Sequence, residues 1–479
     1  MSIRSAHSGI MLLVLFICGS TDCNAADPAG TRQPKALQLA REYLAVKDDD
    51  RRSELARQLA EYDSFTDAVI AKLSQQRYEQ VKPGYHPEEN FSDASLLDKH
   101  PDDLLYFHIP KDYRSDKPCG LVVFMHGGGG DTEREAPHYA IGPHDADDDD
   151  ECSALGSLME DAGLIVVGPS APWDEDCYQR WCLPEADDYL SDVILECKHR
   201  FHIDADKVFL LGHSMGGFGV FHHVQRQPDR FAAVIAHAGS WDLGYWPVIR
   251  GTKLCFINGV KDAEKEPDGD GWIRWHYTDI IYARETDRLL TEQKLDHVFY
   301  EHPDGHDLSY GKPYIARFLA TSKDLRRDPY YPHIAIATPV GYSDYYASPV
   351  SHNRWLTMNE LTPGTIVFDE LVNNDDDDLA FDDWKLQHET AEYEGSALVA
   401  KNRGDNTIEV TTQHVRRFTV WLHSKMVDVN RPVSVMVDGE VKFEGRVTPS
   451  LVTALDSYLR RKDWGLIYPI KVQIDLKDK

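Results

Sequence analysis

The sequence predicts an α/β protein with a doubly wound, mostly parallel sheet, preceded by a helical segment and followed by a β-rich module. Between residues 100 and 326, short apolar runs such as 120–127 and 163–169 alternate with helical stretches such as 187–201. Strand–helix–strand alternation indicates βαβ units and a parallel sheet. After residue 400, apolar and polar residues alternate one by one, which is typical of antiparallel strands with one buried face.

The segments on either side of the predicted sheet have their own patterns. Residues 36–46 and 51–75 repeat apolar residues every three or four positions, which predicts amphipathic helices. The last part alternates in period two and carries a hairpin turn at Asp438-Gly439, so we expect a small sandwich there. The expected divisions are a signal peptide (1–25), a helical segment (26–99), an α/β domain (100–326), a linker rich in Pro, Tyr and Ser (327–353) and a β-rich domain (354–479).

The composition indicates a folded and strongly acidic protein. The 479 residues are 42% hydrophobic and 10% aromatic, enough for two or three domains with buried cores. There are 51 basic and 80 acidic residues, which gives a net charge of −29. Such a surface repels phosphate backbones and anionic lipids, so we expect no nucleic-acid partner and no membrane partner. Solubility is the simplest explanation of the charge.

The first 25 residues have the pattern of a secretory signal. Arg4 precedes nine apolar residues, Ile10–Cys18, and cleavage is expected near Ala25-Ala26. Nine apolar residues are too few to span about 30 Å of hydrocarbon. We therefore expect a secreted or periplasmic protein.

Six cysteines would remain after cleavage. An even number in an exported chain permits three disulfides, and buried free thiols are the alternative. No C-x-x-C pair is present, so neither a zinc knuckle nor a thioredoxin-type site is expected. Two runs of aspartate, 147–150 and 375–378, are expected to be solvated loops, because calcium loops space their ligands on alternate residues. No metal site is expected.

The segment Gly212-His213-Ser214-Met215-Gly216 carries the main indication of chemistry. A G-x-S-x-G motif alone is weak evidence, since it occurs often by chance. Here the motif directly follows the predicted strand 207–211 and opens a predicted helix. This strand–turn–helix setting is the one a nucleophile elbow requires, so Ser214 is the candidate nucleophile.

A run of glycines supplies candidate oxyanion donors. His126 and four glycines, 127–130, follow the predicted strand that ends at Met125. Consecutive glycines let backbone N–H groups approach a developing negative charge without obstruction. We expect the N–H groups of Gly128 and Met215 to form the oxyanion hole.

The candidate acid and base come later in the chain. Asp262 follows the predicted strand 253–259, and His306 follows the predicted strand 297–302 in a glycine-containing loop. The order Ser214, Asp262, His306 is that of an α/β-hydrolase triad. Asp268 and Asp270 are rivals for the acid, and His297 and His302 are less favoured bases because they flank or lie within the strand.

These motifs resemble a known family. FMHGGGG (124–130), GHSMGG (212–217), INGVKD (257–262) and EHPDGH (301–306) are similar to secreted esterases of the α/β-hydrolase superfamily related to polyhydroxybutyrate depolymerases and feruloyl or acetylxylan esterases. The resemblance covers roughly residues 100–326. It implies an α/β-hydrolase fold and a triad of Ser214, Asp262 and His306. The whole arrangement also resembles multidomain hydrolases of planctomycete-type bacteria.

Several tryptophans fall in loops after the predicted strands, at the sheet end where ligands bind in such folds. Stacking on a sugar or an aromatic acyl group is one interpretation, and packing of the loops is the other. Trp241 and Trp272 are the stronger candidates for substrate binding.

Three functions compete at this point. The leading hypothesis is a secreted serine hydrolase that cleaves carboxylic esters, acyl or feruloyl esters of a plant or algal polysaccharide or of a related polyester, with no cofactor. A peptidase of the prolyl-oligopeptidase type has the same fold and triad, but its propeller needs far more than the 80 or so residues before the sheet. A non-catalytic carbohydrate-binding protein on a hydrolase scaffold is the third, least favoured because no triad member is missing.

Overall fold

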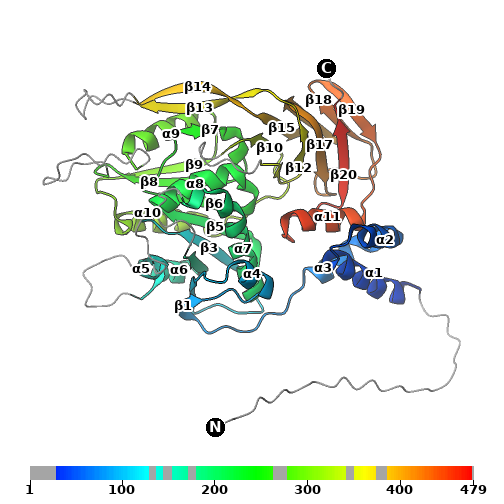
Figure 1. Cartoon of the computed structure of the whole chain (residues 1–479), viewed down its shortest axis with the longest axis horizontal. Coiled ribbons are helices and arrows are strands. Elements are labelled where there is room, and N and C mark those ends of the chain that lie inside the picture. Colours follow the sequence, from blue (N-terminus) through cyan, green and yellow to red (C-terminus); the bar gives the residue numbers. More distant parts are fainter. Residues whose placement is uncertain are drawn as a thin grey trace, which may run out of the picture.

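The computed structural model (Figure 1) describes most of the chain. The described residues are 28–128, 136–143, 154–170, 180–262, 278–340, 350–373 and 386–476. The expected signal peptide, both aspartate runs and Trp272 lie outside them. Within these ranges, no helix combines the length and the apolar character needed to cross a membrane.

An eight-stranded sheet forms the centre of the molecule. Its order is β1-β2-β4-β3-β5-β6-β8-β9, the order of an α/β-hydrolase sheet, which confirms the predicted fold class. The six strands from β4 to β9 in this order pair in parallel. At the edge, β2 pairs antiparallel with both of its neighbours, β1 and β4. The strands are β1 (Gly84–Glu89), β2 (Leu105–Ile109), β3 (Cys119–Met125), β4 (Leu164–Pro169), β5 (Ile203–His213), β6 (Ala233–His237), β8 (Lys253–Gly259) and β9 (His297–His302).

Helices cover both faces of this sheet because its central strands are apolar on both sides. In β3, Leu121 and Val123 belong to one core and Val122 and Phe124 to the other. The first core is closed by α7 (Pro184–Arg200), α8 (Met215–Arg226) and α9 (Ile280–Glu292), and the second by α5 (Ala136–Ile141), α6 (Ala154–Ala162) and α10 (Leu308–Ser322). The remaining short elements of this part are α4 (Ala94–Lys99), β7 (Leu243–Gly244) and the 3-10 turns Arg180–Cys182, Pro228–Arg230 and Trp246–Ile249.

The expected helical segment 26–99 is only partly helical. Within it, Gly84–Glu89 forms β1 and pairs antiparallel with β2, so the sheet begins before residue 100. This strand contains Pro87 and two glutamates, a composition that an edge strand tolerates because one side of its backbone faces solvent.

The helices before β1 pack elsewhere, as Figure 1 shows. They are α1 (Pro28–Ala45), α2 (Asp49–Leu59), the 3-10 turn Ala60–Phe65 and α3 (Thr66–Leu73). Their apolar residues share a core with Leu451 and Leu455 of α11 (Leu451–Arg461) in the carboxy-terminal part. The first and last parts of the chain therefore form one packed unit.

The carboxy-terminal part is a β-sandwich, as expected. A five-stranded sheet (β10-β15-β16-β18-β19) and a four-stranded sheet (β11-β12-β17-β20) share one apolar core. The strands of these two sheets are β10 (His333–Thr338), β11 (His352–Asn353), β12 (Leu356–Leu361), β15 (Ser396–Asn402), β16 (Thr407–Gln413), β17 (Val415–Leu422), β18 (Val433–Val437), β19 (Glu440–Gly445) and β20 (Ile470–Asp475). Two further strands, β13 (Thr365–Asn373) and β14 (Leu386–Glu394), belong to a third sheet with β7. The predicted turn at Asp438-Gly439 joins β18 and β19, with φ of 50° and 85° at its two residues.

Two expectations for this part were wrong. The region 327–353 is not simply a linker, because His333–Thr338 forms β10 and pairs with β15 along its whole length. The strands are also not all antiparallel, since β16 and β18 pair in parallel.

The sandwich is joined to the α/β domain by a shared strand ladder and by buried charges. β13 pairs with β7, a two-residue strand of the α/β domain, and the β13–β14 hairpin lies over α9 (Figure 1). On the other side, Arg327 bridges Asp206 of β5 (3.0 Å) and Asp463 (2.9 Å). Asp463 also binds Lys198 of α7 at 3.0 Å.

Three of the six cysteines cannot be in disulfides. Because Cys119, Cys197 and Cys255 are free thiols, the arrangement with three disulfides is excluded. Cys182 is buried. Cys152 and Cys177 lie outside the described residues. Burial raises the pKa of the Cys197 and Cys255 thiols, so both stay protonated and inert.

Candidate active site

Ser214 stands at a strained turn between β5 and α8. Its φ of 55° and ψ of −117° lie outside the regions that side-chain-bearing residues normally adopt. The turn is held because its glycines allow close packing: a Cβ on Gly212 would overlap the carbonyl of Gly216, and one on Gly216 would overlap that of Met125. The sequence G-x-S-x-G therefore folds here as the strand–turn–helix elbow that it predicts.

His306 lies between Ser214 and Asp262. Its Nε2 is 2.8 Å from Ser214 Oγ, and its Nδ1 is 2.7 Å from Asp262 Oδ1. The side chain of Asp262 is 1% exposed, while that of His306 is 42% exposed. The structure thus brings together the three residues that the sequence proposes, with the carboxylate buried and the imidazole open to a substrate.

The loops after two neighbouring strands place the acid and the base. Asp262 follows β8, His306 follows β9, and these strands pair in parallel up to Gly259 and His302. Two backbone hydrogen bonds tie the loops together, Val260 N–H to His302 O (2.8 Å) and Lys261 N–H to Asp304 O (3.1 Å). The rivals Asp268 and Asp270 lie outside the described residues.

The glycine loop after β3 approaches the nucleophile closely. A Cβ on Gly127 would lie 3.0 Å from the Cβ of Ser214. Gly128, with φ of 129°, is exposed next to it. Met215 begins α8, and the first N–H groups of a helix have no acceptor within it. Met215 thus follows Ser214 in the chain, and Gly128 follows the glycine that approaches Ser214 in space. Their role as oxyanion donors stays a prediction.

The buried side chain of His126 holds this glycine loop in place. Its Nδ1 is 2.8 Å from Gly127 O and its Nε2 is 3.3 Å from Ser170 O, while Trp181 Nε1 donates to the His126 carbonyl at 3.0 Å. Burial lowers the pKa of His126 to about 4, so the ring is neutral near pH 7. A neutral, fully buried anchor holds the loop without adding charge to the site.

A row of three histidines lies under the site, and of these only His302 was weighed from the sequence, as a less favoured base. His213, His237 and His302 are the last residues of β5, β6 and β9. His213 Nδ1 is 2.8 Å from His237 Nδ1, and the rings of His237 and His302 stack at 5.9 Å. Burial, reinforced by the neighbouring imidazoles, lowers the pKa of His213 and His237 well below the usual range. Their shared position at strand ends is the signal that could have revealed them.

Trp241 is not available to a substrate. It is fully buried in the core between the sheet and its helices, so its prediction as a substrate-binding residue was wrong. The alternative interpretation, packing, applies to it. Trp272, the other candidate, lies outside the described residues.

One buried cluster has metal-ligand side chains. Ligand atoms of Asp187, His222 and His223 lie within 4.8 Å of one another. However, Arg226 binds Asp187 Oδ2 at 2.6 Å, so a bound cation would face a guanidinium. Although burial raises it, hydrogen bonds from both histidines hold the pKa of Asp187 well below its usual range. The cluster fits an internal ion-pair network better than a metal centre.

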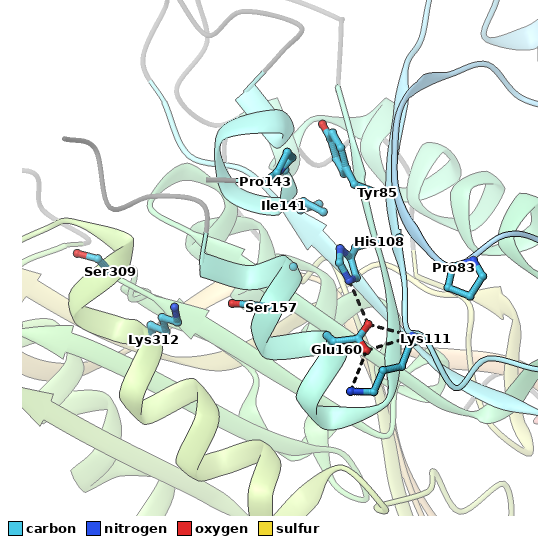
Figure 2. A pocket seen from close by; sticks show the side chains of 13 residues that line it. Pro83, Tyr85, His108, Lys111, Ile141, Pro143, Ser157, Glu160, Ser309 and Lys312 are labelled. Carbon is cyan, nitrogen blue, oxygen red and sulfur yellow. Dashed lines mark hydrogen bonds and ion pairs between the residues drawn. The ribbon is translucent and has the colours of Figure 1, made fainter. Parts of the chain in front are cut away.

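A cavity of about 970 Å³ opens beside the edge of the sheet, between β1, β2, α5, α6 and α10 (Figure 2). In this cavity, the carboxylate of Glu160 lies 3.3 Å from His108 Nε2 and accepts a hydrogen bond from the backbone N–H of Lys111 at 3.0 Å. Ser309 and Lys312 reach it from α10, which starts two residues after His306. None of Ser214, His306 and Asp262 lines this cavity.

Comparison by sequence finds similarity to serine peptidases around the elbow. The model of the prolyl oligopeptidase family matches residues 167–253. Dipeptidyl-peptidase 5 of Porphyromonas gingivalis is 34% identical over 148 residues, which are 29% of this chain and 20% of that protein. The chain therefore spans about a fifth of the length of the curated relative it matches.

Comparison by structure finds esterases. A thermostable esterase is 18% identical (47% of this chain, 60% of the other, TM-score 0.34). A ferulic acid esterase is 16% identical (51% and 99%, TM-score 0.36), and an acetyl xylan esterase from Aspergillus awamori is 13% identical (50% and 99%, TM-score 0.33). In each case about half of this chain is covered.

Proposed function

We propose that this protein is a serine hydrolase that cleaves carboxylic esters through an acyl-enzyme. The observation that carries the proposal is the hydrogen-bonded series Ser214 Oγ–His306 Nε2 and His306 Nδ1–Asp262 Oδ1, at 2.8 and 2.7 Å, on a strained elbow. A strained backbone and a buried carboxylate behind a half-exposed imidazole are costly features that serve acyl transfer well.

In the first half of the proposed reaction, Ser214 Oγ attacks the ester carbonyl carbon while His306 Nε2 takes the hydroxyl proton. The carbonyl oxygen becomes an oxyanion, which the N–H groups of Gly128 and Met215 stabilise. Asp262 stabilises the imidazolium and holds its Nδ1–H in place. The C–O bond of the ester then breaks, and His306 returns the proton to the leaving alcohol.

In the second half, water replaces the alcohol. His306 takes a proton from water, whose oxygen attacks the acyl carbon. The bond to Ser214 Oγ breaks, His306 protonates that oxygen, and the free carboxylic acid leaves. The described side chains supply every proton transfer in this scheme.

A peptidase is the second candidate, and the sequence similarity to the prolyl oligopeptidase family favours it. Ester hydrolysis stays the leading proposal because the resemblance to secreted esterases rests on motifs spread over the whole α/β domain, from FMHGGGG (124–130) to EHPDGH (301–306). The similarity to the peptidase family covers residues 167–253.

Location and natural substrate are also proposals. The apolar run Ile10–Cys18 supports export to the periplasm or the medium. The motif resemblance to feruloyl and acetylxylan esterases and polyhydroxybutyrate depolymerases supports acyl or feruloyl esters of a polysaccharide, or a related polyester, as substrates.

Covalent labelling tests the nucleophile. A fluorophosphonate should add one phosphonyl group to the wild-type chain, and Ser214→Ala should carry none in an intact-mass measurement. Persistence of the adduct in Ser214→Ala would assign the reactive hydroxyl to another residue and remove the basis of the proposal.

A substrate comparison separates the two candidates. We expect faster hydrolysis of p-nitrophenyl acetate than of aminoacyl p-nitroanilides, measured as kcat/KM with the same enzyme preparation. A strong preference for the anilides would reverse the order and make the protein a peptidase.

A further inference from the structure

A groove runs along α7, where the amino-terminal helical segment, the α/β domain and the carboxy-terminal part meet. We call it the junction groove. Two cavities make it up, of about 230 and 390 Å³, and both are lined by Leu195, Lys198 and Lys462. Its walls come from α3, α7, α11 and the loop after α11. None of the residues of the proposed reaction lines it.

The smaller cavity is strongly basic in a chain with a net charge of −29. Six cationic side chains line it: Lys99, Lys198, Arg230, Arg460, Arg461 and Lys462. Only two carboxylates line it with them, Asp188 and Asp192. Such a concentration of one charge in a cavity attracts a ligand of the opposite charge.

Half of these cations already have a carboxylate partner. Lys99 binds Asp192 at 2.7 Å, Lys198 binds Asp463 at 3.0 Å, and Arg461 binds Asp229. The buried carboxylates of the domain junction are thus neutralised by these contacts and by Arg327.

The other three, Arg230, Arg460 and Lys462, form no ion pair with any described carboxylate. Among the described residues, Arg230 donates to the carbonyl of Arg461 at 2.7 Å, and its Nε has no partner there. Burial and the neighbouring Arg461 lower the pKa of Arg230 to about 10. Asp463 and Asp229 offset part of the charge of Arg230 without an ion pair, and Arg460 donates to Thr357 Oγ1 at 3.2 Å. Since none of the three has a carboxylate at ion-pair distance among the described residues, their charge is available to a ligand.

The larger cavity supplies flat rings beside this charge. Tyr458 and Trp464 stack at 3.8 Å, and Tyr78 stacks on His202 at 4.9 Å. All four rings line the cavity and are half-buried. Lys462 lies over the Tyr458 ring at 5.7 Å, so the basic and aromatic ends of the groove adjoin at one residue. Half-buried aromatic rings are surfaces on which sugars and bases stack.

We propose that the junction groove binds a small ligand in which an oxyanion group (carboxylate, sulfate or phosphate) is attached to a ring. The oxyanion lies among Arg230, Arg460 and Lys462, and the ring lies against Tyr458 and Trp464. A ligand there touches both the α/β domain and α11, so it also stabilises the junction between them.

Calorimetric titration of the full chain tests this site with two probes that share the chemistry but differ in source, glucuronic acid and AMP. We expect at least one to bind saturably, and Lys462→Gln to weaken it about tenfold, since charge-assisted contacts are the strong ones. Whichever probe binds more tightly identifies the ring, a sugar or a base.

Lys425→Gln is the matched control, because Lys425 is equally exposed and lies over a tyrosine ring, Tyr330, at 5.3 Å. It should leave binding unchanged. Lack of binding of both probes, equal losses in the two lysine variants, or equal binding of uncharged glucose would overturn the proposal. If inorganic sulfate binds as tightly as both probes, the ligand's ring contributes nothing to binding, and that part of the proposal is overturned. None of these binding measurements depends on esterase activity, so they test the junction groove separately from the proposed function.

Discussion

Asp262 and Asp463 are both carboxylates with side chains only 1% exposed, but their surroundings differ. Asp262 has one partner, His306, and its Oδ2 has no hydrogen bond among the described residues. Asp463 is bound by Lys198, by Arg327 and by the N–H of Gly465 at 2.8 Å. Asp262 is thus a buried charge with one half-exposed partner, whereas Asp463 has three partners.

The difference shows how one fold uses buried charge in two ways. At the site, an unsaturated carboxylate can stabilise a positive charge that appears on His306 only during reaction. At the junction, permanent cations already neutralise Asp463; although burial raises it, Arg327 and Lys198 hold the pKa of this carboxyl well below its usual range. Removing each charge should therefore affect a different property.

The largest effect is expected from Asp262→Asn. Loss of the carboxylate leaves His306 without a charge-balancing partner and in the wrong tautomer, and kcat/KM for p-nitrophenyl acetate should fall about 10⁴-fold. The melting temperature should change little, because only one hydrogen bond is altered. A nearly unchanged rate would mean that another carboxylate, such as Asp268 or Asp270, acts as the acid.

Asp463→Asn should show the opposite pattern. It leaves Lys198 and Arg327 buried without their partner, and breaking a buried pair in this way costs about 3–5 kcal/mol of folding free energy. The measurement is the urea midpoint, compared with Asp324→Asn, whose carboxylate is 84% exposed and binds Lys207 at 3.1 Å.

That control should change stability by no more than about 0.5 kcal/mol. The folded fraction of Asp463→Asn should retain normal kcat. If the two variants are equally stable, the buried network does not hold the junction.

Acid should lower the free energy of unfolding, because buried histidines under the site are neutral in the folded protein. The pKa of His126 is about 4 in the folded protein against 6.5 in an unfolded chain, so the unfolded state binds more protons between these values. Stability is then complete above pH 6.5 and is lost as the pH falls toward 4, by about 3 kcal/mol from this residue alone.

The lowered pKa values of His213 and His237 act in the same direction. Urea midpoints at pH 7, 5.5 and 4.5 would measure the loss, and His126→Gln should reduce it. A midpoint independent of pH across this range would contradict the neutral state of these buried rings.

Much of the α/β domain could be predicted because its strands are unmistakable. The runs at 120–125, 208–211 and 254–257 are apolar, as strands buried on both faces must be. Ser214, Asp262 and His306 follow strands at the same sheet edge. Strand order and turn chemistry then left few alternatives for these three residues.

What the sequence did not reveal depends on partners far along the chain. β10 contains Ile334 and Ile336 on one face, but the prolines on both sides of it suggested a linker, and only pairing with β15 makes it a strand. β1 depends in the same way on β2. Trp241 follows a strand as a binding residue would, and nothing local distinguishes a ring turned inward from one turned outward.

The pairing of β13 with β7 has a practical consequence for dividing this protein. A cut after residue 326 would strip β7 of its neighbour strand and remove Arg354 and Arg461, which hold the buried Asp229. The apolar surface that meets β10 and β13 would then face water and invite aggregation. Cloning boundaries and domain exchanges placed there should yield insoluble product, so the two halves are best expressed, evolved and engineered as one piece.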